Sequence, residues 1–272
     1  MLLGRYKRVI FLGDSNSDNG NVHHMTSQTH PTHGCATIDN TLVAGTVPMP
    51  DGTRAKVPSV SDQVQILYKQ VGTLQKDDLV FIQVGSNDLN SLITTGPLYE
   101  TYSEFTVQDL ATKLAQAVDF LHKKMHARQI ILLNVRPRNE YPGVIRLNIP
   151  EVLKSSEDAT ISLNQAIAHG VGMLQDSMDA EDVCKLVIFD TYGFQKQLTK
   201  DPRAFGIDPA VSEPALVPLE PLLTPGAKQE YLPELKRPET KLFLDDAHFA
   251  KRPQALLAAE VVKAVAILAA GL

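Results

Sequence analysis

The sequence predicts an α/β fold in which a mostly parallel sheet carries crossover helices on both faces. Two observations support this prediction. Short apolar runs typical of buried strands alternate along the chain with longer segments whose apolar residues recur at helical spacing. No internal repeat and no convincing domain boundary interrupts the 272 residues. We therefore expect a single domain over residues 1–272.

Four apolar runs have the length and composition of parallel strands. They are RVIFL (8–12), DLVFIQVG (78–85), QIILLNV (129–135) and KLVIFD (185–190). Because the apolar residues of 8–12 are continuous rather than alternating, both faces of this strand are expected to be buried, and 78–85 is expected to be a second buried strand. Folds of this type bind ligands at the carboxyl ends of their strands. The residues that follow each run are therefore the first candidates for a functional site.

Amphipathic helices are predicted between and after these strands. Apolar residues recur at the helical period in residues 58–71, 106–125, 157–174 and 252–268. Thr106 and Asp109 have the spacing of a capping box, with Asp in place of the usual Glu. Pro253 suits the first turn of the last helix.

Residues 208–240 differ from the rest of the chain in composition. They contain seven prolines, which excludes regular secondary structure. The stretch is also too apolar for a free tail, so we expect an ordered loop that lies over the domain.

Composition excludes several classes of protein. The net charge of −5 offers no basic surface for nucleic acid. No apolar run approaches the roughly 20 residues of a membrane span, so stable membrane insertion is not expected.

The N-terminal residues lack a signal-peptide cleavage site, which predicts an intracellular enzyme, with secretion after removal of a signal as the alternative. Cys35 and Cys184 are expected to be buried free thiols.

The polar motif FLGDSNSDNGN (11–21) directly follows the first predicted strand. Asp14, Asn16 and Asp18 match the alternating ligands of an EF-hand loop, but the glycine and glutamate that such a loop requires are missing. Neither a dinucleotide fingerprint nor a P-loop is present. Two interpretations stay open: a capped turn at the end of a strand, or a nucleophile at Ser15.

A nucleophilic serine needs a base within hydrogen-bond reach and a third group that orients the base. The segment LFLDDAHFA (242–250) supplies Asp245 and His248 immediately before the last helix, with Asp246 as a competing acid. In VGSNDL, after the second strand, Asn87 has an amide N–H that can stabilise an oxyanion. Each motif alone also fits an ordinary turn. Together they supply the residues of one mechanism.

In this order, FLGDSNSDNGN, VGSND and LDDAH resemble the three most diagnostic blocks of the GDSL/SGNH esterase and lipase family. HGCATIDNTLV (33–43) with VPSVSDQV (57–64) is similar to a segment of its fungal-type and related secreted members. The resemblance implies a three-layer α/β/α sandwich of the flavodoxin-like SGNH-hydrolase type. It further implies that Ser15 is the nucleophile, that Asp245 and His248 form the acid–base pair, and that the Asn87 side chain and the Ser15 backbone N–H bind the oxyanion.

One block departs from the family pattern. The glycine that normally follows the first helix and donates a further oxyanion N–H has no clear counterpart, and Gly34 is the candidate substitute. The replaced segment carries four histidines, which have no nearby cysteine or carboxylate to complete a zinc site, so no metal is expected. They are His23, His24, His30 and His33.

The resemblance implies a serine hydrolase without a cofactor that cleaves small carboxylic esters, with short acyl or acetyl esters favoured. A lipase or phospholipase, a thioesterase or an acyltransferase using the same residues are alternatives. A non-catalytic binding protein that keeps the fold is a further alternative.

Overall fold

The computed structural model of the chain describes residues 6–17, 35–49, 52–93, 99–101, 104–178, 184–215 and 239–270. The chain divides into two compact units. The first comprises Met1–Val135 and Ala159–Phe189, and the second comprises Arg136–Asp158 and Asp190–Leu272. The single domain expected over residues 1–272 stays a prediction.

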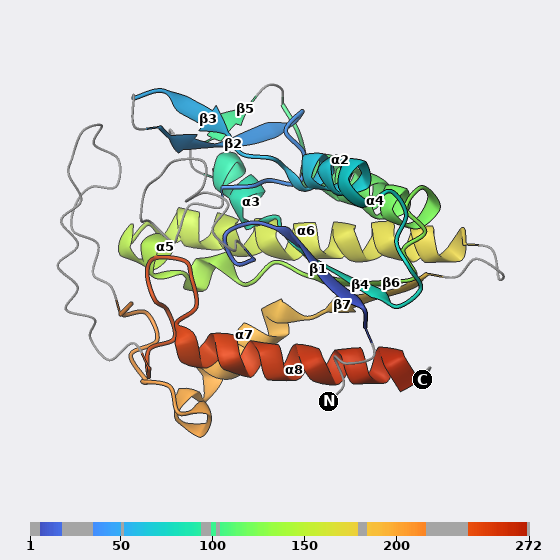
Figure 1. Ribbon diagram of the computed structural model, residues 1–272. Helices are drawn as coiled ribbons and strands as arrows, with labels where there is room; N and C mark the ends of the chain where they lie inside the picture. Colours follow the sequence, from blue (N-terminus) through green and yellow to red (C-terminus); the bar gives the residue numbers. More distant parts are fainter. Residues whose placement is uncertain are drawn as a thin grey trace. The chain divides into compact units, whose positions relative to one another are not determined.

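The first unit is built around a parallel four-stranded sheet with the strand order β1-β4-β6-β7 (Figure 1). These strands are β1 (Arg8–Gly13), β4 (Asp78–Gln83), β6 (Gln129–Leu133) and β7 (Lys185–Phe189). They correspond to the four predicted strands. Since at least one helix lies between each strand and the next one of this sheet along the chain and returns the chain to the same end, the strands run in parallel.

Three helices cover one face of this sheet (Figure 1). They are α2 (Val60–Val71), α4 (Val107–Lys123) and residues 159–176 of α6 (Pro150–Asp176). Their apolar stripes and one set of alternate strand residues form a continuous core. The other set of strand residues is buried as well, at 7% exposure or less: Leu79, Phe81, Ile131 and Leu133. Both faces of β4 and β6 are therefore covered, and the chain has the predicted α/β class with a mostly parallel sheet flanked by helices.

Strand β1 is less buried than predicted. Within the described residues it lies at the edge of the sheet, and its side chains Val9 and Phe11 are 37% and 60% exposed. The Phe11 ring stacks on the ring of Phe81 at 4.9 Å between centroids. Burial of residues 8–12 on both faces was thus a wrong prediction, because a continuous apolar run does not distinguish an edge strand from a central one.

A second, antiparallel sheet was not predicted. It has the order β3-β2-β5, from β2 (Val43–Pro48), β3 (Arg54–Lys56) and β5 (Tyr99–Thr101). Two of these strands are only three residues long, too short to give a periodic signal. Helix α3 (Ser86–Ile93) contacts β2.

The predicted capping box begins α4. The Asp109 N–H donates to the Thr106 hydroxyl at 3.2 Å, and the Asp109 carboxylate accepts from the Thr106 N–H at 2.8 Å. Pro253 lies in the first turn of α8 (Lys251–Ala270), as predicted. Among the helices that the structure describes, none combines the length and apolar character needed to cross a membrane.

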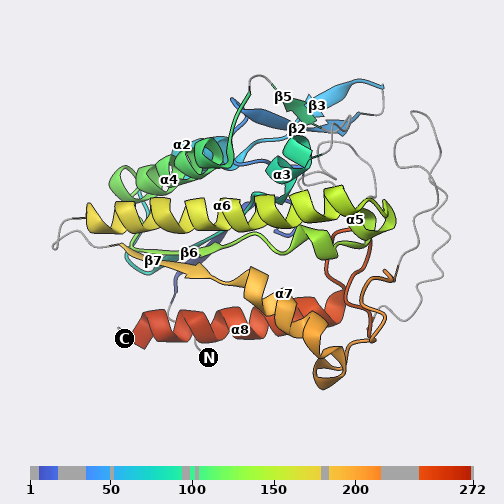
Figure 2. The ribbon, with the colours of Figure 1, turned by 180° about the vertical axis from the view of Figure 1, so that it is seen from behind.

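The second unit has an aromatic core. It contains η2 (Arg138–Glu140), α5 (Pro142–Arg146), the start of α6, α7 (Thr191–Lys200), η3 (Pro202–Phe205) and α8. Helices α7 and α8 are in contact (Figure 2). Four rings form edge or tilted pairs with centroids 5.8 to 6.3 Å apart, namely Tyr141, Phe194, Phe243 and Phe249.

Only the ends of the predicted proline-rich loop are described, and residues 216–238 lie outside the described ranges. The Asp208 N–H donates to the Thr240 carbonyl at 2.7 Å, and the Ala215 N–H donates to the Phe243 carbonyl at 3.0 Å. These bonds attach the described ends to the second unit. The expected order of the whole stretch stays a prediction.

Candidate active site

Ser15 lies in a tight turn at the carboxyl end of β1. The Asp14 N–H donates to the Gln83 carbonyl at 3.1 Å, which extends the pairing of β1 with β4 by one residue. The Asp14 carboxylate accepts from the backbone N–H of Asn16 at 3.0 Å and from its side-chain amide at 2.8 Å. The Ser17 N–H donates to the Asp14 carbonyl at 3.0 Å. The buried Asp14 thus folds the chain around the half-buried Ser15.

The residue before this turn has to be glycine. Gly13 has φ of +150°, and a Cβ there would lie 2.1 Å from the Gln83 carbonyl oxygen. The Gln63 side chain, on α2, accepts from the Gly13 N–H and donates to the Gly13 carbonyl, both at 2.8 Å. Strand β4 and helix α2 therefore both fix the backbone that leads into Ser15.

Asn87 lies in the first turn of α3, directly after β4. Its Nδ2 donates to the Ala36 carbonyl at 2.9 Å. An amide nitrogen carries two N–H groups in one plane, so this bond fixes the orientation of both. The preceding Gly85 has φ of +118°, and a Cβ there would lie 2.7 Å from Val135 Cγ2. The glycine allows the close approach that starts α3 at this position.

The next residue, Asp88, is fully buried. Its two carboxylate oxygens lie 3.0 and 3.3 Å from the Ile38 backbone nitrogen, whose N–H donates to them. Burial, together with the smaller effect of the charges of Asp14 and Asp39, raises the pKa of Asp88 to about 7 against the effect of this hydrogen bond. Asn87 and Asp88 together hold the segment that begins at residue 35.

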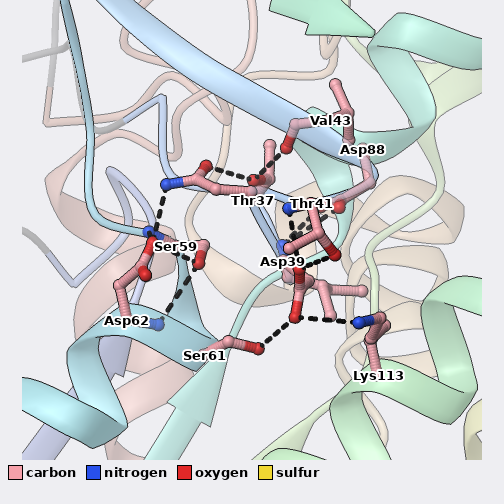
Figure 3. A network of polar contacts seen from close by, with 11 residues as sticks. Thr37, Asp39, Thr41, Val43, Ser59, Ser61, Asp62, Asp88 and Lys113 are labelled. Carbon is pink, nitrogen blue, oxygen red and sulfur yellow. Dashed lines mark hydrogen bonds and ion pairs between the residues drawn. The ribbon is translucent and has the colours of Figure 1, made fainter. Parts of the chain in front are cut away.

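Asp39 lies at the centre of a polar network that fixes the same segment (Figure 3). It accepts hydrogen bonds from the backbone and hydroxyl of Thr41 and from the Ser61 hydroxyl, the last at 2.8 Å. Lys113 Nζ, on α4, lies 3.7 Å from the same carboxylate. Burial alone would raise the pKa of Asp39, but the hydrogen bonds from Thr41 and Ser61 and the charge of Lys113 lower it. The segment is therefore attached to α2, α3 and α4.

In the second unit, His248 lies in a closed loop. Phe243 and Phe249 form an antiparallel bridge, and the Leu244 N–H donates to the His248 carbonyl at 2.7 Å. Inside the loop, one oxygen of Asp245 accepts from the backbone N–H groups of Ala247 and His248, at 2.9 and 2.8 Å. The loop geometry therefore places Asp245 and His248 on the same side of the turn.

The His248 ring contacts this carboxylate directly. Its Nδ1 lies 2.9 Å from each oxygen of Asp245, and both side chains are 21% exposed. Burial alone would raise the pKa of Asp245, but the hydrogen bond and charge of His248 and the two backbone N–H groups lower it. Asp246, the competing acid, forms an ion pair with Arg146. Of the two aspartates, the one beside the imidazole is Asp245.

Other expectations have mixed outcomes. Cys35 and Cys184 are buried thiols that form no disulfide within the described residues, as predicted, and burial raises the pKa of the Cys35 thiol to about 11. Gly34 and the histidines from His23 to His33 lie outside the described residues. In the described ranges, no group of three or more His, Cys, Asp or Glu side chains is arranged to hold a metal ion.

Two buried charged residues that lie beside candidate site residues were not singled out from the sequence, Asp88 next to Asn87 and Arg136 against the loop that carries His248. Asp88 follows Asn87 in the quoted motif, and Arg136 follows the strand at 129–135. The one sequence signal that could have pointed to these two residues was their position near the carboxyl end of a predicted strand. Their burial had no signal in the sequence, because a charged residue after a strand is usually exposed.

Comparison with known proteins adds the family. The model of the GDSL-like lipase/acylhydrolase family matches residues 9–261. Curated protein sequences gave no match. The matched span contains Ser15, Asn87, Asp245 and His248, and it supports an esterase, lipase or acylhydrolase activity in general terms. Because the match extends over most of the chain, the protein belongs to the GDSL-like lipase/acylhydrolase family.

Proposed function

We propose that the protein is a serine esterase or acylhydrolase that cleaves carboxylic esters through an acyl-enzyme, with short acyl or acetyl esters favoured. The observation that carries the proposal is the 2.9 Å contact of His248 Nδ1 with both oxygens of Asp245. A carboxylate at Nδ1 fixes the tautomer and orientation of an imidazole, so that Nε2 can act as a general base. Within a family of acylhydrolases, such a pair predicts a serine nucleophile.

In the proposed mechanism, Ser15 Oγ attacks the acyl carbonyl while His248 Nε2 takes the hydroxyl proton. The same proton passes to the leaving alcohol as the ester bond breaks, which leaves the acyl group on Ser15. Water, deprotonated by His248, then releases the carboxylic acid. The lowered pKa of Asp245 keeps its carboxylate ionised, so it can stabilise the imidazolium that forms in both steps.

The oxyanion is assigned to the Asn87 side chain and the Ser15 backbone N–H, with Gly34 as a weaker third candidate. The bond from Asn87 to the Ala36 carbonyl supports this role because it orients the amide before substrate binds. Donors that need no reorganisation during the reaction are the effective ones in such sites.

The preference for short acyl groups rests on the similarity of residues 33–43 and 57–64 to fungal-type members of the family. Longer-chain lipids, thioesters and acyl transfer to an alcohol are the competing activities. Hydrolysis of p-nitrophenyl esters from acetate to palmitate, with and without added alcohols, separates them. Maximal kcat/KM on acetate or butyrate with no transfer product is the expected result.

A fluorophosphonate probe tests the nucleophile. One covalent adduct per chain is expected, located on Ser15 by peptide mass spectrometry and absent from Ser15→Ala. His248→Ala should neither react nor turn over p-nitrophenyl acetate. Labelling that persists in Ser15→Ala contradicts the assignment of the nucleophile. A folded wild-type protein without labelling or turnover indicates a binding protein that has kept the fold.

A further inference from the structure

A buried arginine contacts both neighbours of His248. Arg136 follows β6 and is only 3% exposed. Its Nη2 donates to the Ala247 carbonyl at 3.0 Å. Its Cζ lies 4.1 Å from the centroid of the Phe249 ring, the distance of a close cation–π contact. The guanidinium thus contacts the residue before His248 and the residue after it.

The surroundings of Arg136 keep its guanidinium in place. The Arg136 guanidinium also lies over the Tyr141 ring, with Cζ 5.2 Å from the ring centroid. Tyr141 and Phe249 each pack on Phe243, at centroid distances of 5.9 and 5.8 Å. A planar cation that lies over two aromatic rings and donates a hydrogen bond has little freedom to rotate, so the direction of its bond to Ala247 is fixed.

Burying a guanidinium is costly unless its hydrogen bonds and charge are compensated. An apolar side chain of similar volume would fill the same aromatic space without that cost. A buried arginine is therefore expected where a fixed N–H donor is useful. The acceptor of that donor is the backbone of the loop that carries Asp245 and His248.

We propose that Arg136 is a positioning residue for His248. It holds the carbonyl of residue 247 and the ring of residue 249, so the backbone of His248 between them cannot rotate. Nδ1 then stays beside both oxygens of Asp245 and the opposite nitrogen keeps one direction. This inference rests on the proposed function for its consequence in catalysis. The contact with Ala247 and Phe249 is independent of that function.

Replacing Arg136 in the full-length protein tests this role. Arg136→Ala should lower kcat for p-nitrophenyl acetate by about 10²-fold with little change in KM, because small displacements of a catalytic group have effects of that size. Added guanidinium ion, at concentrations far below those that denature, should restore part of the lost kcat by occupying the vacated place. Arg136→Lys should recover less than guanidinium does, since an ammonium is not planar and cannot stack on an aromatic ring.

Arg138 is the matched control. It is also 3% exposed and lies over the same Tyr141 ring, with Cζ 5.9 Å from the centroid. Arg138→Ala should lose a similar amount of thermal stability but keep wild-type kcat and show no response to guanidinium. A folded Arg136→Ala with wild-type kcat overturns the proposal, as does a loss of kcat that guanidinium does not restore. If Arg136→Ala does not fold, Arg136→Gln and Arg136→Lys are measured in its place, and wild-type kcat in both overturns it.

A proton NMR measurement separates this inference from the proposed function. The Nδ1–H of His248, bonded to the Asp245 carboxylate, should give a far-downfield signal that disappears in His248→Ala. The signal should weaken or shift in Arg136→Ala and persist in Arg138→Ala. An unchanged signal in Arg136→Ala overturns the positioning role. If the wild-type protein neither hydrolyses esters nor reacts with fluorophosphonate, the proposed function fails while this signal still decides the role of Arg136.

Discussion

Asp245 and Asp246 are adjacent in sequence, yet only Asp245 contacts His248. The backbone N–H groups of Ala247 and His248 both donate to Asp245, which turns its carboxylate into the loop. Asp246 pairs with Arg146 and receives a hydrogen bond from the Gly143 N–H on its carbonyl, at 3.1 Å. The turn therefore gives the two carboxylates different partners, and variants at the two positions should behave differently.

Asp245→Asn is expected to lower kcat for a short ester by about 10⁴-fold, because an amide cannot stabilise the imidazolium and favours the wrong tautomer. Asp246→Asn should keep kcat within roughly twofold, since an exposed ion pair contributes little. Steady-state kinetics on p-nitrophenyl acetate measures both variants. Equal losses in the two would contradict the assignment of Asp245.

Asn87→Ala should lower kcat by about 10²–10³-fold while KM changes little, because the lost N–H acts mainly on the oxyanion of the transition state. Ser91→Ala is a control on the same helix. It removes a hydroxyl that donates to the Asp88 carbonyl at 2.8 Å. Its kcat should stay near the wild-type value, and comparable losses in both variants would indicate that α3 only needs to be intact.

Asp88 should make stability depend on pH. Its folded-state pKa is about 7, whereas an unfolded Asp has a pKa of about 3.9. Between these values the folded protein holds a proton that the unfolded chain releases. The contribution of Asp88 to the free energy of unfolding is therefore fully present below about pH 4. It falls by a few kcal/mol as the pH rises toward 7.

Asp88→Asn removes this titration. The free energy of unfolding from urea denaturation, measured from pH 4.5 to 7.5, should fall less steeply with pH in the variant than in the wild type. The exposed Asp158→Asn on α6 should follow the wild-type slope. Parallel curves for Asp88→Asn and the wild type would show that Asp88 is ionised throughout this range.

Gly13→Ala and Gly172→Ala should change stability in opposite directions. At Gly13 the new methyl group would meet the Gln83 carbonyl oxygen, and φ is positive, so a loss of more than about 1 kcal/mol is expected. At Gly172, in α6, the new Cβ would meet no described atom within 4 Å beyond its own helix backbone and chain neighbours, and a gain of about 0.5–1 kcal/mol is expected. Urea denaturation measures both. A stable, fully active Gly13→Ala would show that the backbone at residue 13 can move away from the Gln83 carbonyl without loss of function.

Local pattern predicted the regular elements well where they were long. The apolar runs at 8–12, 78–85, 129–135 and 185–190 correspond to the four parallel strands. The capping box at Thr106 begins α4. The antiparallel β3-β2-β5 sheet was missed because two of its strands, β3 and β5, have only three residues and carry no period. The exposure of Phe11 was missed because the order of the strands in the sheet decides which strand lies at an edge. The apolar run at 8–12 does not encode that order.

The amino-acid sequence by itself determined the four parallel strands, the four long helices that alternate with and follow them, and the polar motifs after the strands, because hydrophobic period, caps and turn residues act over a few neighbouring positions. Only the tertiary structure decided that Asp246 pairs with Arg146, that Asp88 is buried beside Ile38, and that Arg136 lies over the Phe249 ring. Those contacts join residues distant in sequence. Their burial and hydrogen bonds depend on how the elements pack, which no single segment specifies.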